Sequence, residues 1–563
     1  MSQTSAESPL THQTTIPARL RYIKDTYPNS AAFVFFTPDS RQVTTFGRLY
    51  HLAARFARRL IDRGFQRGDV IANTLVNSLE RLVTDLGIIF AGCIPLNGQI
   101  VLASGEDFFQ SAHAAKCRGV VVRPDERSHA WTLLRHSVSD HKPANMFVQI
   151  SCESAEDMTT AILVRRGESD SELGSDLIRE LLESDDVFEA ELSPQDLAYV
   201  FTTSGSTGFS KLVPRTHQFL FDLTPATGAE MVDYNITHDL AQYNDRPLGW
   251  LGGFPFSTLT VGTKRLILDQ FYEFQTPSDK AALTWRILRE ESIQIPYVLP
   301  LDFYHLLHHV GEIDPDDRVA IIGTGSQPIM KSLVKDMLKI TKTVFLSYGS
   351  TEASIVSYKV ASDVSQFQDF SAGKPLVEKV RIVDKNLQDC RPGEIGTIWV
   401  KTQSLISGYY NPRNPDKARP GNSFLDDGWF NMEDSGYLDD NGELFVLGRA
   451  GDVITQGAHQ VYPGWLEKQM SCHPDVTDVA VVPVSDPVMF QEICACVLPS
   501  TGAVLTEESL RQFANDVLVS DEEITPTPKY FLILKDFPKT STGKVNKKLL
   551  ANMAEEKFGK LTQ

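Results

Sequence analysis

The sequence has few cysteines, no long apolar run and fewer basic than acidic residues. Its 563 residues include seven cysteines, 54 Lys and Arg, and 72 Asp and Glu, for a net charge of −18. This acidic excess argues against a nucleic-acid-binding protein, because such proteins need basic side chains to neutralise phosphates. No stretch approaches the ~20 consecutive apolar residues of a membrane span. The polar first 19 residues have no apolar core of the kind found in secretory signals.

The cysteines lack the spacing of a disulfide framework or a zinc site. Cys494 and Cys496 are two positions apart in a predicted strand and therefore share one face, and Cys472 has no neighbouring pair at zinc-ligand spacing. We expect free thiols in a reducing compartment and a cytoplasmic location. The 42% apolar and 22% charged content is typical of a globular protein and excludes wholesale disorder.

What is present is an alternation of helical and strand patterns. Apolar residues at three- to four-residue spacing predict helices over residues 46–63 and 77–90, with a strand at 70–72 between them. Such alternation favours an α/β fold with mainly parallel sheets. Short alternating runs over residues 379–408 predict an antiparallel sheet or a small barrel, and strands and helices resume after residue 447.

The clearest chemical motif spans residues 199–211, where an apolar strand leads into small and hydroxyl residues and then a lysine. Gly205 and Gly208 allow the backbone amides to turn inward, and Lys211 adds a positive charge. The hydroxyl donors are Thr203, Ser204, Ser206 and Thr207. The pattern predicts a polyphosphate site, although a flexible linker is the alternative. It is not a Walker A loop, in which glycine directly precedes the lysine.

This loop resembles the phosphate-binding signature of the adenylate-forming (AMP-binding) superfamily, and most of all that of acyl- and aryl-CoA synthetases, the acid–thiol ligases. Three further segments follow in the family's order. Residues 347–353 resemble its Tyr-Gly-x-Thr-Glu block, residues 426–454 its ribose-binding and hinge segment, and residues 538–544 its catalytic-lysine loop. The resemblance implies an AMP-binding domain over residues 1–447, with two α/β sheets and a small β-barrel. Residues 448–563 would form a small mobile α+β lid that carries the catalytic lysine.

The resemblance also implies the reaction and the residue roles. ATP would activate a carboxylic acid to an acyl-adenylate, and the acyl group would pass to coenzyme A. Lys544 would stabilise the charge that develops at the α-phosphate, Thr351 would bond that phosphate, and Glu352 would hold Mg²⁺. The remaining nucleotide contacts would be the 203–211 loop with Lys211, the adenine site of Tyr348, Gly325, Ser326 and Gln327, and the ribose site of Asp434 and Arg449.

The sequence departs from the family pattern at several positions. In the phosphate loop, Lys211 is flanked by Ser210 and Leu212, where the family has proline and glycine. Before the ribose residue Asp434 stand Met432 and Glu433, where the family has threonine and glycine. The hinge position is Gly451 rather than Lys or Asp, and Trp465 stands where Glu is common. These changes motivate the hypothesis of a degenerate nucleotide-binding relative without turnover. A free-standing adenylation enzyme that loads a carrier protein in trans and a luciferase-like oxidase are also compatible with the resemblance.

The expected acid pocket is the segment of residues 250–257. It lacks the histidine found near here in many acyl- and aryl-CoA ligases, and Gly253 stands where some aryl-acid activators have asparagine. Gly253 and Phe254 predict an apolar pocket, suited to a medium-chain fatty acid or a simple aryl acid. His217 matches a histidine often found after the phosphate loop and is a further pocket candidate, with a simple helix start as the alternative.

Overall fold

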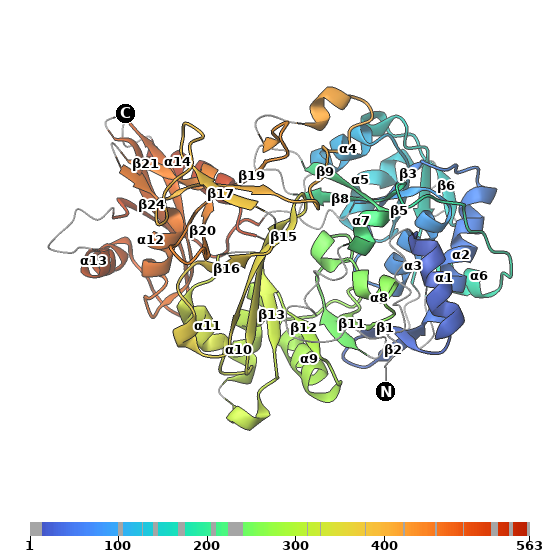
Figure 1. The fold of residues 1–563 in the computed structure, drawn as a ribbon, viewed down its shortest axis with the longest axis horizontal. Helices are drawn as coiled ribbons and strands as arrows, with labels where there is room; N and C mark the ends of the chain where they lie inside the picture. The colour runs from blue at the N-terminus through green and yellow to red at the C-terminus, as the bar shows by residue number, and fades with distance from the viewer. Residues whose placement is uncertain are drawn as a thin grey trace, which may run out of the picture.

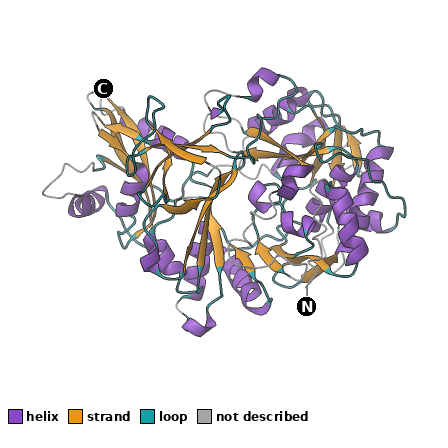
Figure 2. Ribbon diagram, viewed as in Figure 1, coloured by secondary structure: helices purple, strands orange, loops and turns teal. Residues whose placement is uncertain are grey.

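The protein forms three β-sheets with helices packed against them, as the computed structural model shows (Figures 1 and 2). The structure describes residues 14–98, 105–126, 128–138, 145–166, 175–203, 210–222, 240–311, 313–326, 328–377, 379–419, 423–456, 459–487, 489–500, 502–518, 527–539 and 544–559. Two of the sheets belong to the larger N-terminal part and the third to a smaller C-terminal unit. The predicted α/β class and this division into a large and a small part are confirmed.

The first sheet is parallel except at its two edges, where β6 and β9 run antiparallel to their neighbours. In spatial order its strands are β6 (Phe147–Gln149), β7 (Thr160–Leu163), β5 (Cys117–Val122), β3 (Val70–Asn73), β4 (Ile94–Asn97), β8 (Leu197–Thr203) and β9 (Lys211–Thr216). The helices of this half are α1 (Ile16–Thr26), α2 (Phe46–Asp62), α3 (Leu79–Phe90), α4 (Gly105–Ala114), α5 (His129–Leu134), α6 (Asp176–Leu182) and α7 (His217–Asp222).

Helices α2 and α3 confirm the helical periodicity expected from the sequence. Thr45 caps α2 by accepting from the Arg48 amide at 3.2 Å, and Ser78 caps α3 in the same way. The two helices pack closely because Gly87 of α3 has no side chain: a Cβ there would lie 2.6 Å from the Phe56 ring of α2. Helix α3 is buried on all sides, including its charged residues, so each of these needs a partner.

The second sheet runs from a mostly parallel end to an antiparallel end. In order its strands are β2 (Arg41–Thr45), β1 (Ala31–Phe36), β11 (Lys264–Leu268), β10 (Ala241–Asn244), β12 (Ile295–Tyr297), β13 (Ile322–Gly325), β14 (Val344–Ser350), β15 (Ser354–Ala361), β16 (Ser371–Pro375), β20 (Leu444–Arg449), β19 (Phe430–Leu438), β18 (Gly396–Lys401) and β17 (Lys379–Val383). The strands expected to form a small barrel are therefore continuous with this sheet, because β16 pairs with both β15 and β20. Its helices are α8 (Phe256–Thr260), α9 (Pro277–Glu290), α10 (Pro300–Val310) and α11 (Lys331–Met337).

The C-terminal unit has its own sheet and its own apolar core. Its elements are β21 (Ile454–Gln456), β22 (His459–Val461), α12 (Pro463–Met470), β23 (Val476–Asp486), β24 (Phe490–Pro499), α13 (Glu507–Leu518), β25 (Tyr530–Ile533) and α14 (Lys547–Phe558). Cys494 and Cys496 of β24 both face the cluster beneath α14, as their spacing predicted. All seven cysteines are free thiols, and Cys472 is exposed.

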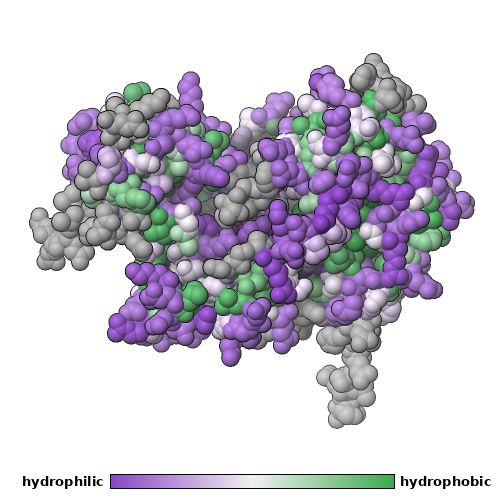
Figure 3. Space-filling view, turned by 90° about the horizontal axis from the view of Figure 1, so that it is seen from above, coloured by the Kyte–Doolittle hydropathy of each residue, from purple (hydrophilic) through white to green (hydrophobic). Residues whose placement is uncertain are grey.

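The surface is predominantly hydrophilic on the face that Figure 3 presents, with small scattered apolar areas. The outline is indented between the C-terminal unit and the rest of the molecule in the same view. Among the described helices, none combines the length and the apolar content needed to cross a bilayer.

A buried polar network supports the strand that leads into the phosphate loop. Arg81 of α3 pairs with Asp85 at 2.9 Å and donates to the Tyr199 hydroxyl of β8 at 3.0 Å. It also donates to the Asn97 side chain of β4, which in turn donates to Thr202 at 3.0 Å. Arg81 is 1% exposed, so the network sits in a low-dielectric interior and fixes β8 against α3 and β4.

Replacing Arg81 with leucine is expected to destabilise the fold strongly. Truncating one partner of a buried ion pair leaves Asp85 uncompensated, which costs about 3–5 kcal/mol. Chemical denaturation should show this loss in the free energy of unfolding. The matched control is Arg58→Leu, because Arg58 pairs with Asp62 on the exposed surface of α2, and its loss should have little effect on the free energy of unfolding. Equal losses for the two variants would contradict a structural role of the network.

Candidate functional site

The predicted adenine and ribose residues converge where β14, β19 and β20 lie side by side. The Tyr348 hydroxyl of β14 donates to Asp434 Oδ2 of β19 at 2.7 Å. Asp434 is paired in register with Arg449 of β20, and Arg449 Nη1 lies 3.3 Å from Asp434 Oδ1. Tyr348 and Asp434, which are 86 positions apart in sequence, therefore form one contact network with Arg449. Its carboxylate can accept from vicinal hydroxyls, and its aromatic ring offers a flat face.

The catalytic-lysine candidate lies within the electrostatic reach of this network. Desolvation and then the positive charge of Arg449 lower the pKa of Lys544, while Asp434 opposes that shift. Desolvation raises the pKa of Asp434, and Arg449, Tyr348 and Lys544 all act in the opposite direction. The C-terminal unit thus brings its lysine to the site formed by the N-terminal part. A cation here can compensate negative charge on a phosphate.

The metal-ligand candidate Glu352 lies in the turn between β14 and β15. Its side chain is buried and accepts a hydrogen bond from the Tyr409 hydroxyl at 2.9 Å. Arg215 of β9 donates to the backbone carbonyls of both Thr351 and Glu352, and to that of Ser404 at 2.8 Å. Burial lowers the pKa of Arg215 to about 9, and the charge of Glu352 partly offsets that shift. The turn is therefore held from the first sheet.

The phosphate-loop lysine lies close to Glu352. Lys211 Nζ is 5.4 Å from the centre of the Tyr409 ring, whose hydroxyl bonds Glu352. It also forms an ion pair of 3.1 Å with Glu433. Thr203 ends β8 and is paired with Lys211 across the β8–β9 hairpin. The remaining loop candidates, Ser204, Gly205, Ser206, Thr207 and Gly208, lie outside the described residues.

The second wall of the predicted adenine site is at the end of β13. Gly325 is buried, and a Cβ there would overlap the Ser347 carbonyl oxygen and come within 2.9 Å of the Tyr297 hydroxyl. Close backbone approach therefore requires glycine at this position. Ser326 follows with a left-handed backbone, φ +77°, and is exposed. Gln327 lies outside the described residues.

Two of the predicted acid-pocket residues are part of close packing. Gly253 ends a short 3-10 turn, and a Cβ there would overlap the Pro247 carbonyl oxygen, so asparagine does not fit this backbone. Phe254 is buried, with its ring centre 5.5 Å from that of Tyr199 and 5.7 Å from that of Phe201. Their contact with an acid remains a prediction.

The third pocket candidate, His217, begins helix α7 and is buried. Its Nδ1 accepts from the Ile16 amide at 3.2 Å. Burial lowers the pKa of His217 to about 4, so the ring is neutral at physiological pH. A pocket role for this histidine also remains a prediction.

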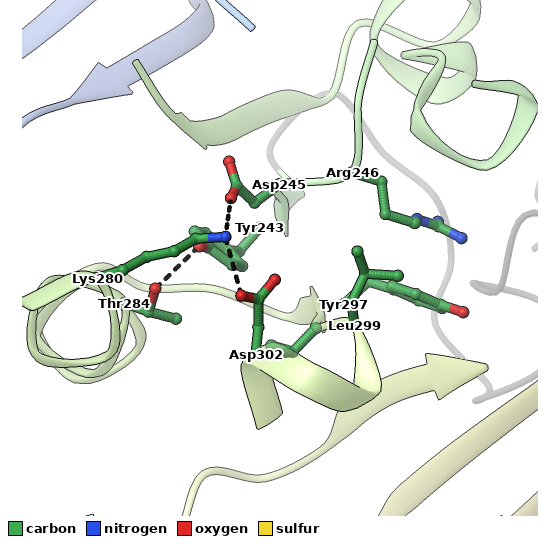
Figure 4. A pocket seen from close by; sticks show the side chains of 9 residues that line it. Tyr243, Asp245, Arg246, Lys280, Thr284, Tyr297, Leu299 and Asp302 are labelled. Atoms are coloured by element: carbon green, nitrogen blue, oxygen red, sulfur yellow. Dashed lines mark hydrogen bonds and ion pairs between the residues drawn. The ribbon is translucent and has the colours of Figure 1, made fainter. Parts of the chain in front are cut away.

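An arginine just before the predicted pocket segment was missed by sequence reasoning. Arg246 stacks on the Tyr297 ring, with its guanidinium carbon 3.5 Å from the ring centre. Its Nη1 would lie 2.5 Å from a Cβ on Gly252, so glycine makes room for it. Figure 4 shows the guanidinium and the Tyr297 hydroxyl pointing the same way, and that hydroxyl lies 3.3 Å from Ser347 Oγ. No motif marks this arginine, since it is one of many charged residues near a strand end.

Figure 4 also shows an ionic cluster of Lys280, Asp245 and Asp302, on the side away from the Arg246 guanidinium. Lys280 of α9 bridges Asp245 at 3.2 Å and Asp302 at 2.9 Å, and Tyr243 is hydrogen-bonded to Thr284 beside them. The cavity that these groups line together with Arg246 and Tyr297 is about 10 Å³, enough for one water molecule at most. This cluster therefore joins α9 to α10 and is too small for an organic acid.

The predicted hinge lies between β20 and β21. Gly451 is exposed, and a Cβ there would meet nothing within 4 Å. The C-terminal unit also touches the larger part through an ion pair between Lys468 of α12 and Asp369. The hinge role and the boundary at residue 447 remain predictions.

These residues fit the nucleotide and the metal that the sequence implies. Lys211, Arg449 and Lys544 supply positive charge around an acidic ribose candidate, and Glu352 supplies the hard oxygen ligand that Mg²⁺ prefers. Tyr409 and Arg215, which position Glu352, were also missed, because single aromatic and basic residues outside a motif carry no recognisable pattern.

Comparisons with known proteins identify the family of this chain. Residues 21–410 match the AMP-binding enzyme family, and residues 466–544 match the AMP-binding enzyme C-terminal domain. Oxalate–CoA ligase of Arabidopsis thaliana is 26% identical over 92% of this chain and 96% of its own length. 2-Succinylbenzoate–CoA ligase of Bacillus licheniformis is 26% identical over 90% of this chain and 96% of its own length.

The fold is likewise shared with solved structures. The o-succinylbenzoate coenzyme A synthetase of Bacillus subtilis, in complex with ATP and magnesium ion, is similar with a TM-score of 0.74 and 20% identity over 96% of this chain and 99% of that one. The chain therefore belongs to the AMP-binding enzyme family, as an AMP-forming acid–thiol ligase with ATP, Mg²⁺ and coenzyme A as its cofactors and co-substrates.

Proposed function

We propose that this protein joins an aromatic carboxylic acid to AMP and then transfers the acyl group to coenzyme A. The observation that carries the proposal is the convergence of Tyr348, Asp434 and Arg449 with Lys544 of the C-terminal unit. Nucleotide recognition and a cation for the reacting phosphate thus meet at one site, which is what adenylation requires.

The proposed chemistry has two steps. In the first, a carboxylate oxygen attacks the α-phosphorus of ATP, and the bond to pyrophosphate breaks with its electron pair on the leaving group. Two anions meet in this step, so Lys544 acts by compensating charge, and Thr351 bonds the phosphate. Glu352 would hold Mg²⁺, which neutralises phosphate charge when bound. In the second step, the thiolate of coenzyme A attacks the acyl carbon and AMP leaves.

Arg246 supports an acid that carries a second anionic or acceptor group. Its guanidinium lies beside Tyr297, which contacts the Gly325 and Ser347 region of the predicted adenine wall. Its Nε donates to Asn244 Oδ1 at 3.1 Å, and among the described residues no ion pair joins it to a carboxylate, so a substrate carboxylate would complete its contacts. The substrates named for the similar oxalate and 2-succinylbenzoate ligases are both dicarboxylates. This proposal replaces the medium-chain fatty acid or simple aryl acid expected from the sequence with an aryl acid that carries a second carboxylate.

The first test of the proposed function is ATP–pyrophosphate exchange with fatty, aryl and dicarboxylic acids. Exchange is expected with aryl acids that carry a second carboxylate, because these satisfy both Arg246 and the reacting centre. Product analysis with coenzyme A alone as acceptor should then show the acyl-CoA. Exchange without acyl-CoA would favour loading of a carrier protein in trans. ATP binding without exchange for any acid would favour a degenerate relative without turnover.

Lys544→Ala is expected to abolish adenylation but leave thioester formation from supplied acyl-AMP largely intact. The lysine is proposed to act on the phosphate of the first step only, and loss of such a charge costs about 10²–10³-fold in rate. Each half-reaction should be measured separately. Lys548→Ala is the matched control, because Lys548 is exposed on α14 in the same unit. Equal loss of both half-reactions in Lys544→Ala would contradict the assignment.

Arg246→Leu is expected to reduce selectivity for dicarboxylic acids. A charge-assisted hydrogen bond is worth about 1.5–3 kcal/mol, so kcat/KM for such an acid should fall about 10- to 100-fold. The corresponding monocarboxylic aryl acid should be affected much less, and Arg246→Lys should recover part of the loss. Arg391→Leu, at an exposed arginine of the antiparallel extension, is the control. An equal fall in kcat/KM for both acids would show that Arg246 supports the structure and does not select the acid.

A further inference from the structure

Glu433 adopts a backbone conformation that its side chain disfavours. Its φ is +58°, in the left-handed region that is unfavourable for a residue with a Cβ. The sequence pattern that this segment resembles has glycine here. The strain arises at a bulge, since β18 and β19 pair at Trp399 with Asn431 and again at Thr397 with Ser435. Strained residues of this kind persist where the surrounding structure compensates them, and they concentrate at functional sites.

Three contacts with other described residues contribute to this compensation. The Glu433 amide donates to Asn431 Oδ1 at 2.8 Å, which fixes the bulge. Its carboxylate accepts from Ser423 Oγ at 3.1 Å and from Lys211 Nζ at 3.1 Å. The Lys211 and Glu433 side chains are 16% and 29% exposed, so their ion pair is only partly screened by water. The left-handed backbone of Glu433 thus places its carboxylate next to Lys211 of the phosphate loop.

Glu433 also adds negative charge to the rest of the site. The pKa of Arg449 is raised mainly by Asp434, and Tyr348, Glu433 and Glu352 act in the same direction. Glu433 therefore interacts electrostatically with Arg449, as do the ribose candidate Asp434 and the metal candidate Glu352. A triphosphate entering this field meets a repelling carboxylate and a lysine that is already paired.

We propose that Glu433 occupies the place of a nucleotide phosphate on Lys211 when ATP is absent, and that the triphosphate displaces it. This inference rests on the proposed function, because it takes Lys211 as a ligand of the β- and γ-phosphates. Lys211 exchanges one anion for another, so the affinity for ATP is lowered by the free energy of the pair that breaks. After pyrophosphate forms, the same carboxylate competes for Lys211 and favours release of that product.

The proposal distinguishes ATP from AMP. AMP has no β- or γ-phosphate and leaves the Lys211–Glu433 pair intact, so its affinity should not depend on Glu433. Glu433→Gln keeps the length of the side chain and the backbone strain but removes the charge. Glu433→Gly removes both, and should in addition raise the melting temperature by relieving the strain.

The experiment is calorimetric titration of the full chain with ATP and Mg²⁺, and separately with AMP. Both Glu433 variants are expected to bind ATP about tenfold more tightly, the scale of one charge-assisted hydrogen bond, and AMP within about twofold of wild type. Glu394→Gln is the matched control, because Glu394 pairs with Arg391 on the exposed surface of the same antiparallel extension. It should change neither affinity.

Four outcomes would overturn the inference. Unchanged ATP affinity in Glu433→Gln would show that the pair does not compete with phosphate. Weaker ATP binding in that variant would make Glu433 a ligand of the metal–nucleotide complex instead. An equal increase in affinity for ATP and for AMP would show that the negative charge of Glu433 repels any nucleotide, without competition for Lys211. A wild-type protein that binds neither nucleotide would contradict the proposed function itself, and the inference with it.

Discussion

The guanidinium of Arg215 joins the two N-terminal sheets at the point where the site forms. It leaves β9 of the first sheet and donates to the carbonyls of Thr351 and Glu352 in a turn of the second, and to that of Ser404. Its burial makes these bonds strong and their loss costly. The phosphate loop begins on one sheet and the metal candidate lies on the other, so Arg215 helps to fix their relative position.

The charges of the site are nearly balanced without a ligand. Lys211 pairs with Glu433 and Arg449 with Asp434, while Lys544 approaches from the C-terminal unit. A buried or half-buried cation without an anion would be costly, so the protein supplies its own carboxylates. A nucleotide must replace some of these ion pairs. Its binding free energy is therefore the free energy of the new ion pairs minus that of the ion pairs it breaks.

The acid-pocket residues predicted from the sequence are part of close packing. Close backbone packing at Gly253 excludes a side chain there, and Phe254 is part of an aromatic cluster in the core. The polar feature near the expected pocket is instead Arg246, held flat on Tyr297. A segment that is apolar in sequence can therefore border a charged group, because the chain turns back between β10 and α8.

The sequence by itself determined the α/β class, the helical and strand periods and the order of the motifs, because these depend on local spacing. It also identified Tyr348, Asp434 and Arg449 as a group through resemblance, and the structure brings these three into contact. Only the tertiary structure decided which side chains outside the motifs join them. Arg215, Arg246 and Tyr409 have no local pattern, and their roles arise from contacts between segments far apart in the chain. The partner of Glu433 was also undecidable from sequence, because its left-handed backbone and its ion pair exist only once β19 bulges toward Lys211.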